Sequence, residues 1–219
     1  MRRLLTLLCL CGLVATVPPR TADAGPWPRE AGKTFLTLSW ERDLMRDIGY
    51  AGMYGEYGLT DRLTLGWDIG ADPDGLSKAI AFARIPFGES PGGMRLALEM
   101  GTGVADKRPV MRPAMSFGRG LNMAGRSGWM TLDIRATIFQ DTFDTAWESD
   151  LTLGLNATAR GKAIIQLQTG QPVTGDAYIK LGSSWVMQGP PGRHIEFGLL
   201  TGLKNSDALA AKIALWHDF

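Results

Sequence analysis

Cysteine and histidine are almost absent from the 219 residues of this chain. Its two cysteines, Cys9 and Cys11, both lie near the amino terminus, and its two histidines are His194 and His217. After residue 11 the chain therefore offers no disulfide, no thiol nucleophile and no cysteine metal ligand. Two histidines without a cysteine or a wider histidine cluster make a weak metal site. We expect neither a metal nor a cofactor.

The chain also lacks a charge excess and a long apolar run. Its formal net charge is +1 at pH 7, which gives no electrostatic reason to expect a nucleic-acid partner. Hydrophobic residues make up 45% of the sequence, yet no run after Val17 approaches the roughly 20 residues that a spanning helix needs. A nucleic-acid-binding protein and a helical membrane protein are both disfavoured.

The first 24 residues have the order of a secretory signal peptide. Arg2 and Arg3 form a short basic start, Leu4 to Val17 is apolar, and Ala22-Asp23-Ala24 is a small-x-small cleavage site. The apolar run is too short for a transmembrane helix. We predict a signal peptide at 1–24 and a mature domain at 25–219.

From Lys33 to the end, apolar and polar residues alternate, and 28 glycines fall mostly in or between the alternating segments. Period 2 indicates half-buried strands. About twelve segments of roughly 9–12 residues match the length of a tilted strand that crosses a bilayer. The predicted segments are 34–43, 49–59, 62–71, 78–87, 94–104, 112–121, 128–139, 149–159, 162–170, 177–187, 193–203 and 208–219. The fold predicted is an all-β, antiparallel, up-and-down transmembrane β-barrel of about 12 strands, with 10–14 possible.

The positions of the charges favour a barrel over a soluble β-sandwich. If the apolar parity of each segment faces outward, nearly all charged residues fall on the opposite parity, as expected when one face meets hydrocarbon. Arg119 is the exception and lies near a strand end. A sandwich also alternates, but uniform segment length and an even count favour the barrel, with both chain ends in the periplasm. The predicted lumen-lining residues are Glu41, Glu56, Asp68, Arg84, Glu99, Asp133, Arg135, Asp150, Arg160, Lys180, Glu196 and Lys212.

Short loops and a belt of aromatics complete the predicted barrel. The segment 105–111 is predicted as an outer loop, and 122–127 as a periplasmic turn. Aromatics near strand ends are candidates for interfacial girdles, although ordinary strand packing explains any one of them equally well. They are Trp40, Tyr57, Phe87, Trp129, Trp185 and Phe219.

The last segment ends in Phe219 and carries Ile213, Leu215 and His217 on the same parity. This ending resembles the sorting signal of Gram-negative outer-membrane β-barrels. The resemblance implies residence in the cell outer membrane, with outer-membrane lipid and the barrel-assembly machinery as partners. It also implies that Phe219 pairs beside the first strand, near 35–40.

A second resemblance covers the hairpin Glu56-Tyr57-Gly58-Leu59-Thr60-Asp61-Arg62-Leu63-Thr64-Leu65-Gly66. It is similar to the tight hairpin in barrels of the phenol-degradation meta-pathway transporter type and in small uncharacterised proteobacterial outer-membrane proteins. Asp61 explains it physically, because its side chain caps its own turn. The resemblance implies an outer-membrane barrel and names no solute.

Two functions fit the predicted lumen. Acids and bases in similar number either line a narrow channel for small polar solutes or pair into a plug, which would make a structural or interaction barrel. An outer-membrane hydrolase needs a histidine beside a serine or acid, and neither His194 nor His217 has one at a motif spacing. We therefore predict a channel or transporter, and we predict no catalytic residue and no metal site.

Overall fold

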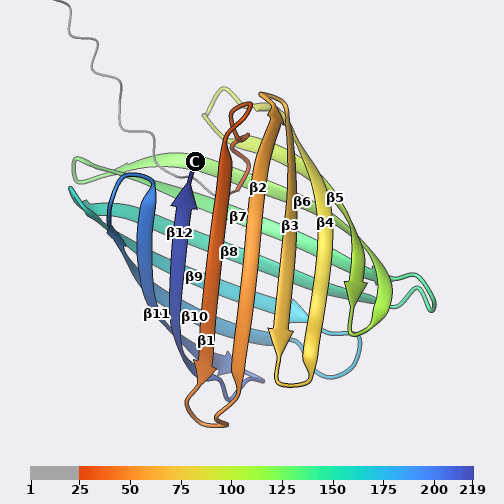
Figure 1. Ribbon diagram of the computed structural model, residues 1–219. Coiled ribbons are helices and arrows are strands. Elements are labelled where there is room, and N and C mark those ends of the chain that lie inside the picture. Colours follow the sequence, from red (N-terminus) through yellow and green to blue (C-terminus); the bar gives the residue numbers. More distant parts are fainter. Residues whose placement is uncertain (1–24) are drawn as a thin grey trace, which may run out of the picture.

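The computed structural model describes residues 25–219 as one closed antiparallel β-barrel of twelve strands, each bonded to its sequence neighbours, with β1 joined to β12 (Figure 1). No helix within 25–219 is long and apolar enough to cross a membrane. The strands are β1 (Thr34–Asp43), β2 (Gly49–Thr60), β3 (Leu63–Asp72), β4 (Gly75–Glu89), β5 (Arg95–Ala105), β6 (Arg108–Met123), β7 (Arg126–Phe139), β8 (Thr145–Thr158), β9 (Gly161–Gln171), β10 (Tyr178–Gln188), β11 (Arg193–Lys204) and β12 (Leu209–Asp218). The predicted fold and strand count are confirmed; the signal peptide lies outside the described residues and stays a prediction.

The exterior of the barrel is apolar along its strands. Leu38 and Trp40 of β1 are 45% and 47% exposed, and Leu215 of β12 is 53% exposed. Exposed large apolar side chains recur on eleven of the twelve strands, and those of β7 on the same parity, such as Leu132 and Ile134, are half-buried. A soluble monomer rarely exposes a contiguous apolar patch of more than a few hundred Å². The surface is therefore suited to lipid, and the soluble sandwich is excluded by the closed topology.

The interior, by contrast, is polar. Glu56 is 1% exposed, Arg112 3%, and Arg84 and Glu99 8% each. Some apolar side chains are buried as well, among them Phe35, Phe82 and Trp129, and within residues 25–219 Ile80, Val110 and Phe139 form a small cluster with Ala105 packed against it. Polar groups inside and apolar groups outside reverse the arrangement of a soluble domain, as a barrel in lipid requires.

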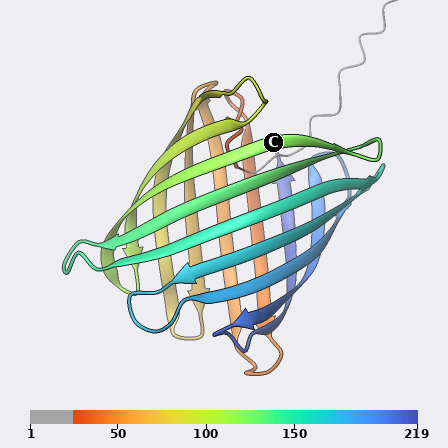
Figure 2. The same ribbon diagram turned by 180° about the vertical axis from the view of Figure 1, so that it is seen from behind.

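The seam between β1 and β12 closes the barrel in the predicted place. Phe35 lies opposite Asp218, and Trp40 lies opposite Ile213. The Phe219 amide donates to the Thr34 carbonyl at 2.9 Å. Both chain ends of residues 25–219 lie at the same end of the barrel, here called the terminal end (Figures 1 and 2). The opposite end is called the far end.

Strands β6 and β7 run longer than predicted, because the connections on either side of β6 are tight turns and not loops. At the far end Ala105 pairs with Arg108, so Asp106-Lys107 alone connects β5 to β6, with φ of 51° and 63°. At the terminal end Met123 pairs with Arg126 around Ala124-Gly125, with φ of 52° and 77°. Two positive φ values define a type I′ turn, whose twist matches that of the flanking strands. The predicted loop at 105–111 is wrong.

The turn at Ala124 gives a first testable prediction. Alanine in the left-handed region costs about 1–2 kcal/mol, and asparagine tolerates that region far better. Ala124→Asn should therefore raise the free energy of unfolding by about 0.5–1 kcal/mol. Gly125→Ala in the same turn should lower it. Denaturant titration of the folded barrel in detergent measures both, and equal stability of the two variants would contradict the turn assignment.

Candidate functional site: the lumen

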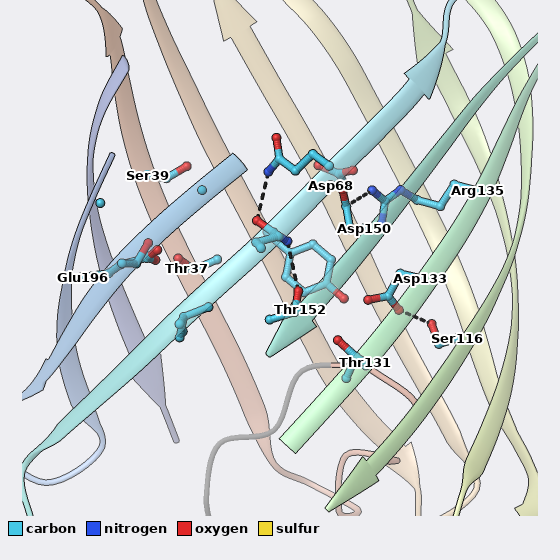
Figure 3. A pocket seen from close by; sticks show the side chains of 18 of the residues that line it. Thr37, Ser39, Asp68, Ser116, Thr131, Asp133, Arg135, Asp150, Thr152 and Glu196 are labelled. Carbon is cyan, nitrogen blue, oxygen red and sulfur yellow. Dashed lines mark hydrogen bonds and ion pairs between the residues drawn. The ribbon is translucent and has the colours of Figure 1, made fainter. Parts of the chain in front are cut away.

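A cavity of about 370 Å³ occupies the inside of the barrel and is lined by residues from all twelve strands. Its lining differs from one wall to the other. Strands β3 to β6 each contribute at least one charged group, and strands β9 and β10 contribute mostly amides, a hydroxyl and a glycine. Figure 3 shows Glu196, Thr37 and Ser39 on one side of this space and Asp133, Ser116 and Thr131 on the other.

The charged wall is a continuous series of ion pairs, here called the charged ladder, whose members are Glu56, Arg84, Glu99, Arg112, Asp68 and Lys78. Arg84 is its centre and contacts Glu56 at 2.5 Å and Glu99 at 2.8 Å. The sheet register sets up this contact, because Arg84 of β4 lies directly opposite Glu99 of β5. The Tyr54 hydroxyl donates to Glu56 at 2.5 Å and accepts from Arg84 at 3.0 Å.

The ladder continues toward the far end through Arg112. Its guanidinium contacts Glu99 at 3.4 Å and Asp68 at 2.6 Å, and Lys78 contacts the same Asp68 carboxylate at 2.9 Å. Buried charges are tolerated only when paired and hydrogen-bonded. Within the ladder each basic group touches an acid, so this wall presents no unpaired cation to the cavity.

The opposite wall is neutral and polar. Gln168 donates to Gln166 at 2.9 Å, and Gln166 donates to Thr152 at 3.2 Å, which links three inward residues of β8 and β9 (Figure 3). Gly182 and Gly198 of the neighbouring strands also line the cavity. This neutral wall, defined by these five residues, offers amide and hydroxyl groups with little bulk.

Between the walls, charges again occur mostly in pairs. Arg135 forms an ion pair with Asp150, and Lys212 contacts Glu196 at 3.2 Å. Asp133 differs, because its hydrogen-bond partner is the Ser116 hydroxyl. Glu41 also lines the cavity. In residues 25–219 neither Asp133 nor Glu41 forms an ion pair, so the charge left uncompensated in this space is acidic.

The amino-terminal residues Gly25–Arg29, here called the terminal strap, also reach into the lumen, and Gly25 and Arg29 line the cavity. This position was not predictable from the sequence, because these residues have no strand periodicity. Arg29 contacts Glu56 at 2.9 Å and Asp218 at 3.4 Å. The Gly25 carbonyl accepts from Arg84 at 3.2 Å. The strap therefore joins the charged ladder to the β12 end of the seam.

Most predicted lumen residues lie where the parity placed them. Glu56 belongs to the charged ladder, and nine line the cavity: Glu41, Asp68, Arg84, Glu99, Asp133, Arg135, Asp150, Glu196 and Lys212. Arg160 was placed wrongly, because β8 ends at Thr158 and Arg160 is exposed in the turn that follows. Lys180 points inward but lies over the Tyr178 ring at 4.9 Å, outside the cavity lining.

Three basic residues of the site were absent from the predicted set: Arg29, Lys78 and Arg112. Lys78 and Arg112 share the inward parity of their strands, so the same rule was enough to find them. Each lies at the first position of its predicted segment, where a strand boundary is least certain. Arg29 precedes the first strand, and no signal in the sequence points to it.

Trp129 is a correction among the proposed girdle aromatics. It is 5% exposed and lines the cavity, where its ring lies over Gly154 of the paired strand. A Cβ at Gly154 would overlap that ring, so glycine makes the room. The other five are exposed by 39% to 67%: Trp40, Tyr57, Phe87, Trp185 and Phe219. Those five suit an interfacial belt.

The two histidines lie at the terminal end. His194 lies opposite Trp216 in the β11–β12 register, and the His217 ring lies 3.7 Å from the Phe219 ring. No group of three metal-ligating side chains occurs among residues 25–219. Ile213 and Leu215 face outward, at 44% and 53% exposure. A sorting role for these last residues stays a prediction.

At the far end, Arg108 clamps two connections together. Its guanidinium donates to both carboxylate oxygens of Asp141, at 2.8 and 2.6 Å, and lies over the Phe139 ring at 4.2 Å. These hydrogen bonds hold the pKa of the exposed Asp141 below its usual value. The turn before β6 is thereby tied to the loop after β7, outside the cavity.

No protein-family model matches the sequence, and no curated protein matches it. Solved structures match the fold. The KdgM porin has a TM-score of 0.64 at 5% identity, over 84% of this chain and 99% of that one. The NanC porin has 0.58 at 8% identity, over 83% and 97%. An outer-membrane channel from Pseudomonas putida F1 has 0.57 at 10% identity, over 91% and 100%.

Each of these three chains is aligned over nearly its whole length, so the similarity covers the complete barrel. The similarity confirms the predicted fold, a small closed β-barrel of the kind found in outer-membrane porins. The narrower resemblance to the phenol-degradation transporter type stays a prediction, as does any solute.

Proposed function

We propose that this outer-membrane barrel is a narrow channel for small polar solutes. The observation that carries the proposal is the cavity of about 370 Å³ inside the barrel, with polar groups around it. Hydrogen-bonding groups that line a pore replace the water that a solute loses on entry. An enzymatic role has no support in the lumen, since neither histidine belongs to a serine or acid arrangement of the catalytic kind.

The charges favour neutral or zwitterionic solutes over strongly anionic ones. Each lumen arginine and lysine of the site is paired with an acid, so a polyanion would find no free cation. The KdgM porin has been solved with disordered oligogalacturonate, which is a polyanion. In this lumen such a ligand would meet arginine and lysine side chains that are already paired with acids.

A second candidate is a structural barrel whose lumen is plugged. The charged ladder favours it, because buried ion pairs fill much of one side of the lumen. Recording from purified, folded protein in planar bilayers separates the two. Discrete conductance steps are expected for the channel, and silence from protein that migrates as a folded barrel on gels supports the plug.

The uncompensated acid Asp133 gives a prediction on selectivity. A near-balanced lumen with two unpaired carboxylates, Asp133 and Glu41, should give a weak preference for cations, visible as a small reversal potential in a salt gradient. Asp133→Asn should reduce that preference, because it removes the charge and keeps a partner for Ser116. Asp74→Asn, in an exposed turn, is the control and should leave the reversal potential unchanged. A stronger cation preference in Asp133→Asn would contradict the assignment.

A further inference from the structure

The terminal strap crosses the lumen from one wall to another. At one end Arg29 contacts Glu56 of β2 and Asp218 of β12, and its guanidinium lies over the Phe35 ring at 5.1 Å. At the other end the Gly25 carbonyl accepts from Arg84 of β4. A segment that reaches β12, β2 and β4 occupies cross-section that a solute would otherwise use.

Packing on the β6–β7 side is close. Pro26 is almost completely buried, and a Cβ at Gly118 of β6 would lie 2.6 Å from its ring. A Cβ at Gly25 would lie 2.7 Å from the Thr131 methyl of β7. Such distances show direct contact between the strap and the two strands, with glycine on one side of each contact.

Backbone hydrogen bonds fix the strap and the residues just after it. The Arg29 amide donates to the Thr64 hydroxyl at 3.1 Å, the Ala31 amide donates to the Asp61 carboxylate at 3.1 Å, and the Gly32 amide donates to the Gly58 carbonyl at 2.8 Å. These bonds attach the strap to the β2–β3 hairpin. It is thus an ordered part of the barrel.

We propose that the terminal strap is the constriction of the channel and that it sets the size limit for solutes. The ion pairs of Arg29 with Glu56 and Asp218 hold the strap in place and are called the latch. This inference rests on the proposed function. The recorded polar and packing contacts of Gly25–Arg29 are with β1 to β4, β6, β7 and β12 of the described chain. The remaining space lies toward the neutral wall. Solutes therefore pass between the strap and that wall, which selects small uncharged molecules rich in hydroxyl or amide groups.

Two variants test the constriction. Arg29→Ala removes the latch, and the triple change Pro26→Gly, Trp27→Ser, Pro28→Gly keeps the length of the strap but removes its packing. Arg42→Ala is the matched control, because it breaks an exposed arginine–aspartate pair with Asp47 at the far end. Each full-length protein is purified from outer membranes, checked for heat-modifiable migration, and studied by single-channel recording and by liposome swelling with neutral polyethylene glycols of increasing size.

We expect the triple variant to raise conductance about twofold or more and to admit larger polymers, since pore diameter limits conduction. Arg29→Ala should raise the conductance by less, either as a smaller steady increase or as frequent transitions to the larger conductance level. Arg42→Ala should have the conductance and size limit of the wild type. A silent wild type with a conducting triple variant supports the strap as a closed constriction. A conducting wild type with unchanged conductance and size limit in the folded triple variant overturns the strap proposal alone. Silence from all folded variants overturns both the strap proposal and the channel.

Discussion

Replacing Arg84 with methionine is expected to lower the free energy of unfolding by about 3–5 kcal/mol. Arg84 is 8% exposed and holds the carboxylates of Glu56 and Glu99 at 2.5 and 2.8 Å. Without the guanidinium, two buried acids remain close to each other with one fewer cation between them. Removal of one partner from a buried ion pair is strongly destabilising, because the other charge stays buried and unpaired.

The control for this change is Arg95→Met at the terminal end. Arg95 also contacts an acid, Glu89 at 3.0 Å, but the two side chains are 40% and 50% exposed. An exposed pair of this kind contributes at most about 1 kcal/mol. Guanidinium titration of both variants in detergent, followed by tryptophan fluorescence, measures the difference. Equal stability of the two variants would mean that the charged ladder is hydrated and adds little to stability.

A double variant distinguishes two causes of the stability lost in Arg84→Met. Arg84→Met combined with Glu99→Gln removes one cation and one acid together, so fewer charges remain uncompensated. If the loss in Arg84→Met comes from unpaired acids, the double variant should recover part of it. If the loss comes from the packing of the arginine stem, the second change should add to the damage.

The strands were predictable because each one has a single lipid-facing side. That condition forces period 2 along the whole chain, and it fixes which parity carries charge: Leu38 faces outward and Glu41 inward for one physical reason. The same rule already placed Trp129 inside, since it shares the parity of Asp133. Its assignment to a girdle relied on its nearness to a strand end, which is weaker information than parity.

The contacts across the lumen were not predictable in the same way. Parity shows that Arg84 and Glu56 face inward, but it does not show that they meet, because β3 separates their strands and the barrel's curvature brings them together. The terminal strap is a stronger case. Residues 25–29 carry no periodic pattern, and their place depends on the glycines at 25 and 118 that allow close approach. The prediction that Arg160 lines the lumen was wrong for a related reason, because parity does not locate the end of a strand.

A second large effect is expected on the outside of the barrel, where Leu151→Arg should lower the free energy of unfolding in lipid vesicles by about 2–4 kcal/mol. Leu151 is 40% exposed on β8 and lies between Leu132 of β7 and Leu167 of β9 in the sheet register. Near the middle of the bilayer an arginine has no water and no counter-ion.

The same substitution at Leu203, which is 58% exposed and next to the end of β11, should cost about 0–1 kcal/mol, because a charge near the interface reaches the headgroups. Denaturant titration of the two variants in the same vesicles gives a depth dependence that a protein surrounded by water would not show. Equal, small effects at both positions would contradict the lipid-facing assignment of β8 and of the apolar exterior as a whole.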